Sequence, residues 1–236
     1  RAIPPSKIHS AMDEMPDGRL IMATHTTVPA PGHPVWMIDA YYDHTWEGFA
    51  GGNLLIYDPA TDEVQNLGVP VPRESIYGGM YDARHHAYYM LGYLRGHLYR
   101  YDIERGVVKD LGQVSEYGSF RFARGSDGHL YGSTRSGWLW KIDVDQGRVV
   151  DLNYRLPAPS DFRARRQFAF AATGPDGRLY ISHRISDQLV ALDVRSGRVE
   201  DLGCMDPMPV AENGPSCVSG LSWDDHGRLW YGIGRR

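Results

Sequence analysis

Four copies of one 13-residue segment recur along the chain, and they constrain its fold more than any other feature. The copies start at residues 56, 100, 141 and 191 and read IYDPATDEVQNLG, RYDIERGVVKDLG, KIDVDQGRVVDLN and ALDVRSGRVEDLG. In each copy a β-forming stretch ends in aspartate, a polar turn follows, and a second stretch closes on Leu-Gly or Leu-Asn. Aspartate at a strand end can accept hydrogen bonds from its own turn. Each copy therefore predicts a β-hairpin.

A second hairpin signal lies ahead of each copy. Stretches of β-forming residues flank a tip such as Asp-Gly at residues 13–25, 125–134, 174–183 and 223–232, and residues 81–91 take this place in the second repeat. Each repeat thus holds four antiparallel strands, which we term a to d. The aspartates that close strand c are 44, 41 and 50 residues apart: Asp58, Asp102, Asp143 and Asp193. This period predicts an all-β fold, a β-propeller of four-stranded blades.

The repeats predict four complete blades and half of a fifth in one domain, 1–236. The expected blades cover approximately residues 5–68, 74–112, 117–153, 165–203 and 217–236. An open ring would leave strand edges unpaired, so we expect part of a six- or seven-bladed ring. A five-bladed ring closed by the N-terminal residues is the alternative. Since the sequence starts at Arg1 without methionine, we expect an excerpt of a longer protein.

Two strings in the hairpin tips resemble a known repeat. GPDGRLY at 174–180 and DDHGRLW at 224–230 are similar to the Gly-Pro-Asp-Gly-x-Leu-Trp motif of streptogramin-lyase-like propellers. The resemblance concerns scaffold residues along most of the chain. It implies the propeller fold far more than any activity.

Charge and cysteine content limit the possible partners and compartments. The net charge of −4 argues against nucleic acid and membrane surfaces, which favour a basic protein face, and no apolar stretch is long enough for a membrane span. Cys204 and Cys217 could form a disulfide, which would fit a periplasmic or extracellular protein, or remain two buried thiols. We find no apolar signal segment within residues 1–236.

One face of the predicted propeller carries the long loops. The connection between strands b and c is short in three blades but runs from Thr26 to about Gly51 in the first. Long loops on a rigid scaffold often hold binding sites, and aromatic rings suit stacking against flat ligands. We expect substrate-binding residues on this face: Trp36, Tyr42, Trp46, Arg165 and His183. Alternatively, the loop aromatics form a small core of their own.

The starts of the innermost strands supply the candidate catalytic residues. Equivalent positions in the first three blades hold His9, Tyr77 and Arg121, and the last two hold Ala169 and Ser219. Hairpin pairing around residues 16–17 places His25 beside Ile8 or His9. These side chains are expected around the central channel.

Histidine, tyrosine and arginine together match the needs of β-elimination. A base takes the proton next to a carboxylate, an arginine neutralises the carboxylate, and an acid protonates the leaving oxygen. We assign His9 as base, Tyr77 as acid or base, Arg121 as carboxylate clamp and His25 as orienting group. The residue types resemble those of propeller polysaccharide lyases, which implies a carbohydrate-active lyase acting on an acidic poly- or oligosaccharide.

Other functions remain open at this point. The same residues could line a wet channel in a non-catalytic propeller that binds a glycan, a protein or another small ligand through this rim. A divalent metal held by His9, His25 and a loop carboxylate such as Asp43 or Glu47 would fit a metal-dependent lactonase or lyase, although no ligand spacing supports it. Three further histidines are expected at the surface: His97, His129 and His226. The cofactor and the oligomeric state are undetermined.

Overall fold

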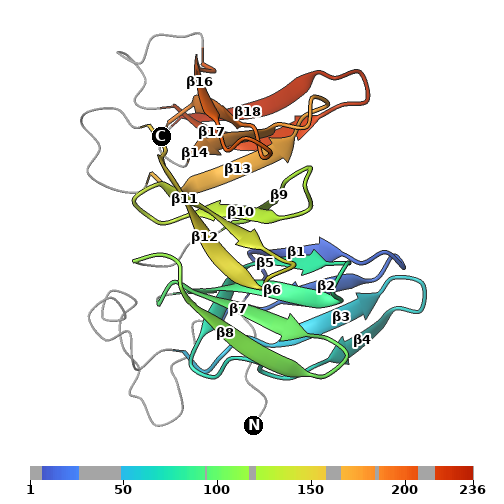
Figure 1. Cartoon of the computed structure of the whole chain (residues 1–236). Coiled ribbons are helices and arrows are strands. Elements are labelled where there is room, and N and C mark those ends of the chain that lie inside the picture. Colours follow the sequence, from blue (N-terminus) through green and yellow to red (C-terminus); the bar gives the residue numbers. More distant parts are fainter. Residues whose placement is uncertain are drawn as a thin grey trace. The chain divides into compact units, whose positions relative to one another are not determined.

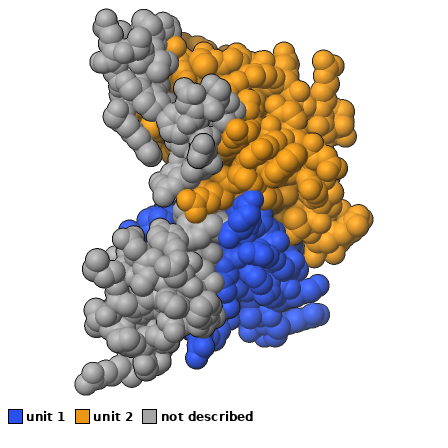
Figure 2. Space-filling model, turned by 90° about the vertical axis from the view of Figure 1, so that its left-hand side faces the viewer, with its two compact units in different colours: residues 1–120 blue, residues 121–236 orange. Residues whose placement is uncertain are grey.

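The computed structural model describes the chain in two compact units, residues 1–120 and 121–236 (Figure 2). The described residues are 7–26, 49–93, 95–116, 121–157, 166–183, 186–206 and 216–235. Every element in these ranges is a β-strand, so the predicted all-β class is confirmed. Several residues predicted to bind substrate or metal lie outside them: Trp36, Tyr42, Asp43, Trp46, Glu47, Arg165 and the side chain of His183.

The first unit contains two four-stranded antiparallel sheets joined edge to edge (Figure 1). Blade 1 consists of β1 (Ser10–Glu14), β2 (Leu20–Ala23), β3 (Leu54–Asp58) and β4 (Glu63–Asn66). Blade 2 consists of β5 (Ser75–Asp82), β6 (Ala87–Tyr93), β7 (His97–Asp102) and β8 (Val107–Gln113). A short parallel pairing of Ser10 with Gly78 joins the two innermost strands, β1 and β5.

The second unit contains two more four-stranded sheets and a final hairpin. Blade 3 consists of β9 (Ala123–Arg124), β10 (Leu130–Ser133), β11 (Trp138–Asp143) and β12 (Arg148–Arg155). Blade 4 consists of β13 (Phe168–Thr173), β14 (Leu179–His183), β15 (Gln188–Leu192) and β16 (Val199–Cys204), and β17 (Ser216–Trp223) pairs with β18 (Leu229–Arg235). The predicted strand order within each repeat is confirmed. The number of blades in the complete ring stays a prediction.

The repeated aspartates cap the c–d turns, as the sequence predicts. Asp58 accepts a hydrogen bond from the Ala60 amide at 2.9 Å, and Asp143 accepts one from the Gln146 amide at 3.0 Å. Asp102 and Asp193 do the same in their own turns. These bonds satisfy turn amides that the strands leave unpaired.

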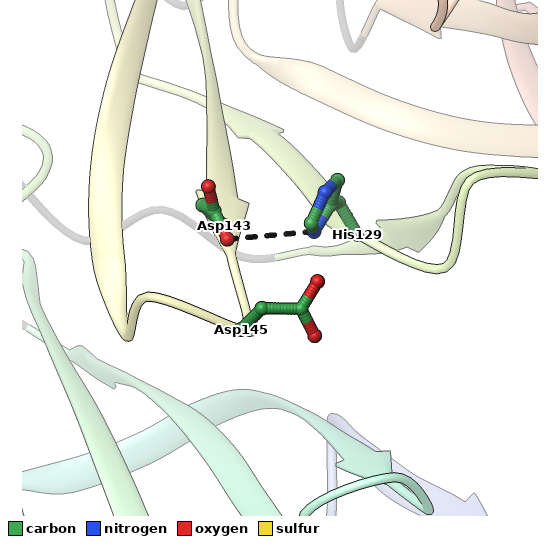
Figure 3. Close-up of side chains that lie close together, drawn as sticks. All are labelled: His129, Asp143 and Asp145. Carbon is green, nitrogen blue, oxygen red and sulfur yellow. Dashed lines mark ion pairs between the residues drawn. The ribbon is translucent and has the colours of Figure 1, made fainter.

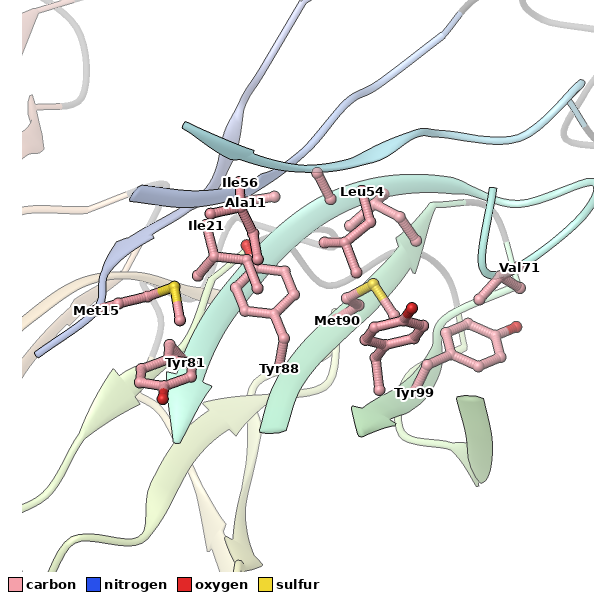
Figure 4. Close-up of a cluster of buried hydrophobic side chains, with 13 residues drawn as sticks. Ala11, Met15, Ile21, Leu54, Ile56, Val71, Tyr81, Tyr88, Met90 and Tyr99 are labelled. Carbon is pink, nitrogen blue, oxygen red and sulfur yellow. The ribbon is translucent and has the colours of Figure 1, made fainter. Parts of the chain in front are cut away.

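In every blade the outermost strand is more exposed than the second strand. In blade 2 the strand β6 is almost entirely buried, whereas β4, the outermost strand of blade 1, is exposed along its length. The apolar side chains of the first unit form one core, in which Tyr88 and Met90 are fully buried (Figure 4). Gly79 makes room for this core, because a Cβ atom there would lie 2.1 Å from the Tyr88 hydroxyl.

Candidate functional site

A β-bulge interrupts the innermost strand at the positions that the sequence singles out. One extra residue is inserted between Ile76 and Gly78 in β5, and the corresponding extra residue is Ala169 in β13 and Ser219 in β17. Bulges bend a strand and change the direction of a side chain, and they are frequent beside functional sites. The bulge therefore explains why Tyr77 leaves the regular alternation of its strand.

Blade 1 has a larger irregularity at the same place. Met12 pairs with Met22, while the backbones of Lys7 and His25 bond to each other in both directions at 2.7 and 3.3 Å. Between these two pairs the chain advances five residues on one side, from Lys7 to Met12, but only three on the other, from Met22 to His25. His25 pairs with Lys7 rather than with Ile8 or His9 for this reason, and His9 lies in the extra segment.

The structure brings three of the four predicted catalytic side chains together. The rings of His9 and Tyr77 stack with centroids 3.8 Å apart and planes 17° apart. The His25 ring meets both edge-on, at 4.9 Å from His9 and 5.1 Å from Tyr77. Tyr93 and Phe49 complete the group, at 5.2 and 5.8 Å from His25. We call these five residues the histidine–tyrosine cluster.

Burial gives the two histidines of the cluster different properties. His25 is only 3% exposed, whereas His9 and Tyr77 are half-buried. Burial, followed by the positive charges of His9 and Lys7, lowers the pKa of His25 to about 3. His25 is therefore neutral at physiological pH. His9 is the more exposed of the two histidines.

Hydrogen bonds hold the chain next to His25. The Ser75 hydroxyl accepts a bond from the Thr26 amide at 2.8 Å and donates one to the Thr26 carbonyl at 3.0 Å. All of these atoms are buried. Thr26, directly after His25, is thereby bonded to the start of β5, the strand that carries Tyr77.

A buried carboxyl group that the sequence analysis missed lies beside Ser75. Glu74 is fully buried, pairs with the Arg95 guanidinium and accepts a hydrogen bond from the Tyr99 hydroxyl at 3.2 Å. Gly92 makes room for it, since a Cβ atom there would lie 2.6 Å from the Glu74 carboxylate. Burial outweighs the attraction of Arg95 and raises the pKa of Glu74 to about 7.

Arg121 belongs to the second unit. Its guanidinium lies over the Phe170 ring, 4.1 Å from the centroid. Its predicted cooperation with His9 and Tyr77 stays a prediction. His183 ends β14, where its backbone pairs with Phe168.

Among the described residues, one group has the composition of a metal site. His129, Asp143 and Asp145 each offer a ligand atom, and these atoms lie within 4.8 Å of one another (Figure 3). His129 is half-buried rather than at the surface, where the sequence places it. Cys204 and Cys217 are free thiols, so no disulfide supports an extracellular location. Within the described ranges, no helix has the length and apolar character needed to cross a membrane.

Comparison with known proteins identifies the fold. No protein-family model matches the sequence, and a search of curated protein sequences gives no match. Virginiamycin B lyase from Staphylococcus aureus matches in structure with a TM-score of 0.67 and 13% identity, over 97% of this chain and 66% of that one. The chain has the fold of the streptogramin B lyase propellers. The predicted streptogramin-lyase-like propeller is thus confirmed.

Two further matches show the range of proteins that share this fold. A catalytically inactive histidine-to-alanine variant of the same Staphylococcus aureus lyase, solved with quinupristin, matches with a TM-score of 0.59 and 12% identity over 99% of this chain and 82% of that one. Hydrazine synthase from Kuenenia stuttgartiensis matches with a TM-score of 0.64 and 16% identity over 98% of this chain and 57% of that one. The streptogramin-lyase-like fold therefore accompanies different chemistries.

The prediction of a lyase for acidic poly- or oligosaccharides is wrong. The lyases of this fold that the comparison finds are named for virginiamycin B and streptogramin B rather than for a glycan. The error has a physical reason. Histidine, tyrosine and arginine supply proton transfer and charge neutralisation, which an elimination needs whatever its substrate, so these residue types do not encode a sugar.

Proposed function

We propose that the protein is a lyase and that the histidine–tyrosine cluster carries out its proton transfers. The observation that carries the proposal is the stacking of half-buried His9 on Tyr77, above the buried neutral ring of His25. Two side chains able to accept and donate protons thus lie in contact, beside the buried ring of His25, which stays neutral. The fold supports this class of reaction, since a histidine replacement inactivates one of the similar lyases.

The chemistry follows from the different environments of the two histidines. His9 takes a proton from a carbon of the substrate, the C–H electron pair forms a double bond, and the bond to the leaving atom breaks. Tyr77 donates its hydroxyl proton to the leaving atom, and solvent restores both groups. His25 stays neutral, because burial and the charges of His9 and Lys7 hold its pKa at about 3.

Quinupristin is the first substrate to test, because a protein of the same fold was solved with it. We propose a small molecule of this kind as substrate. The assay is mass spectrometry of the products formed by the purified protein. An elimination yields products whose masses add up to that of the substrate, whereas hydrolysis adds one water. A product containing the added water contradicts the lyase proposal.

Variants test the roles within the cluster. His9→Ala and Tyr77→Phe are each expected to reduce kcat by roughly 10²–10⁴-fold, the usual contribution of a general acid or base. His226→Ala is the matched control, since His226 is an exposed histidine in the final hairpin of the second unit. Full activity in His9→Ala would refute the assignment. Loss of activity in His226→Ala would refute it equally.

A further inference from the structure

The tips of the a–b hairpins allow the repeats to be compared with one another. In three of them the residue after the tip glycine is an arginine that forms an ion pair with an aspartate of its own tip, at 2.6 to 2.7 Å: Arg19, Arg178 and Arg228. Blade 3 has His129 in this position. There the tip carboxylate of Asp127 accepts a hydrogen bond from the Tyr131 hydroxyl at 2.7 Å instead. Blade 3 therefore has a histidine, a side chain able to bind a metal ion, where these three tips have a positively charged arginine.

The c–d turn of blade 3 contains a second carboxylate. Two residues after the strand-closing aspartate, blade 1 has Ala60 and blade 4 has Arg195, whereas blades 2 and 3 have Glu104 and Asp145. Blade 3 thus combines two carboxylates with a histidine, where blades 1 and 4 combine one carboxylate with an arginine.

The geometry of the three side chains fits a shared ligand. The Nδ1 atom of His129 accepts the Val144 amide proton at 3.3 Å, so this nitrogen carries no proton of its own. It lies 4.0 Å from a carboxylate oxygen of Asp143, and the Asp145 carboxylate extends toward the same ring (Figure 3). Each of the three side chains thus presents a ligand atom toward the other two. An ion bound through Nδ1 replaces the Val144 hydrogen bond. A cation is the natural complement of such a set.

We propose that His129, Asp143 and Asp145 bind a divalent transition-metal ion, with Zn²⁺ as its representative. One imidazole nitrogen and two carboxylate oxygens are ligands that Zn²⁺ accepts, whereas Mg²⁺ and Ca²⁺ prefer oxygen alone. His129 precedes β10, and Asp143 and Asp145 lie at the end of β11 and in the turn after it. The ion therefore links the two hairpins of blade 3 and stabilises that blade.

The experiment measures zinc binding and unfolding of the protein. Cys204 and Cys217 are replaced by serine to remove competing thiols, and bound metal is removed with a chelator. We expect one equivalent of Zn²⁺ to bind. At a free concentration of about 100 times Kd, Zn²⁺ should shift the unfolding equilibrium about 100-fold toward the folded state. Mg²⁺ at the same concentration should leave it unchanged.

The repeat itself supplies the decisive variant. His129→Arg restores the residue of the other tips, so the variant is expected to fold normally and to lose the zinc response, as is Asp145→Asn. His97→Ala is the control, because His97 also contacts a carboxylate, that of Asp110 at 2.9 Å, but has no third ligand within the described residues. A zinc response that survives in His129→Arg overturns the proposal. So does one that disappears in His97→Ala, or the absence of binding in the parent protein.

Discussion

Replacing Glu74 by glutamine should change how the stability of the protein depends on pH. Glu74 is fully buried, and its pKa is raised to about 7 from an ordinary 4.5. Glutamine has the same shape as the protonated acid, so the Tyr99 hydroxyl can still donate to it, and half-exposed Arg95 can turn to water. The variant is therefore a permanently neutral version of this site.

The size and sign of the effect follow from the raised pKa. Because the folded state holds the proton more tightly, the stability due to protonated Glu74 is present below pH 4.5 and is lost as the pH rises through 7. Each tenfold change in proton affinity is worth about 1.4 kcal/mol, so the whole change is about 3 kcal/mol. The free energy of unfolding of Glu74→Gln, relative to the parent protein, should rise by this amount between about pH 4 and about pH 8.

Urea unfolding of both proteins across this pH range measures the difference. Other titrating groups cancel in the subtraction, because both proteins contain them. A difference that stays constant within about 0.5 kcal/mol, or that falls with pH, would refute the reasoning. Direct titration of the glutamate carboxyl carbons by NMR is the control: one signal should titrate near pH 7 in the parent protein and be missing in Glu74→Gln.

Two further predictions concern packing and hydrogen bonding near the site. Gly79→Ala should cost about 1–3 kcal/mol by forcing a Cβ atom against buried Tyr88, whereas Gly220→Ala, with open space around it, should cost less than about 0.5 kcal/mol. Equal denaturation midpoints for the two variants would contradict the packing argument. Ser75→Ala should cost about 1–3 kcal/mol because it removes two buried hydrogen bonds to the Thr26 amide and carbonyl. Exposed Ser126→Ala is its control in the same thermal unfolding assay, and a smaller loss in Ser75→Ala than in Ser126→Ala would contradict the prediction.

The sequence predicts the strands well because their signals are local. An aspartate that caps its own turn and a glycine at a hairpin tip act within a few residues, so Asp58 and its three equivalents mark the strand ends correctly. The same alignment finds Tyr77, Ala169 and Ser219, which the structure shows to be the bulged residues of their strands. Repetition makes such positions visible without any knowledge of the packing.

Features that depend on packing between distant residues are not visible in this way. In the sequence Glu74 is an ordinary polar residue. Only the fold shows that Gly92, which has no side chain, leaves room for its carboxylate and that Arg95 pairs with it. His129 reads as a surface residue, yet its ring turns toward the next hairpin of the blade. The substrate is hidden for a different reason, since proton-transfer groups are shared by lyases with unrelated substrates.

The central claim is that the histidine–tyrosine cluster contacts the ligand. NMR spectra of the histidine imidazoles, recorded during a titration with quinupristin and assigned from single histidine variants, test it without relying on catalysis. The signals of His9 and His25 should shift saturably, while those of His129 and His226 stay in place. Unchanged His9 and His25 signals at saturating quinupristin would contradict the claim.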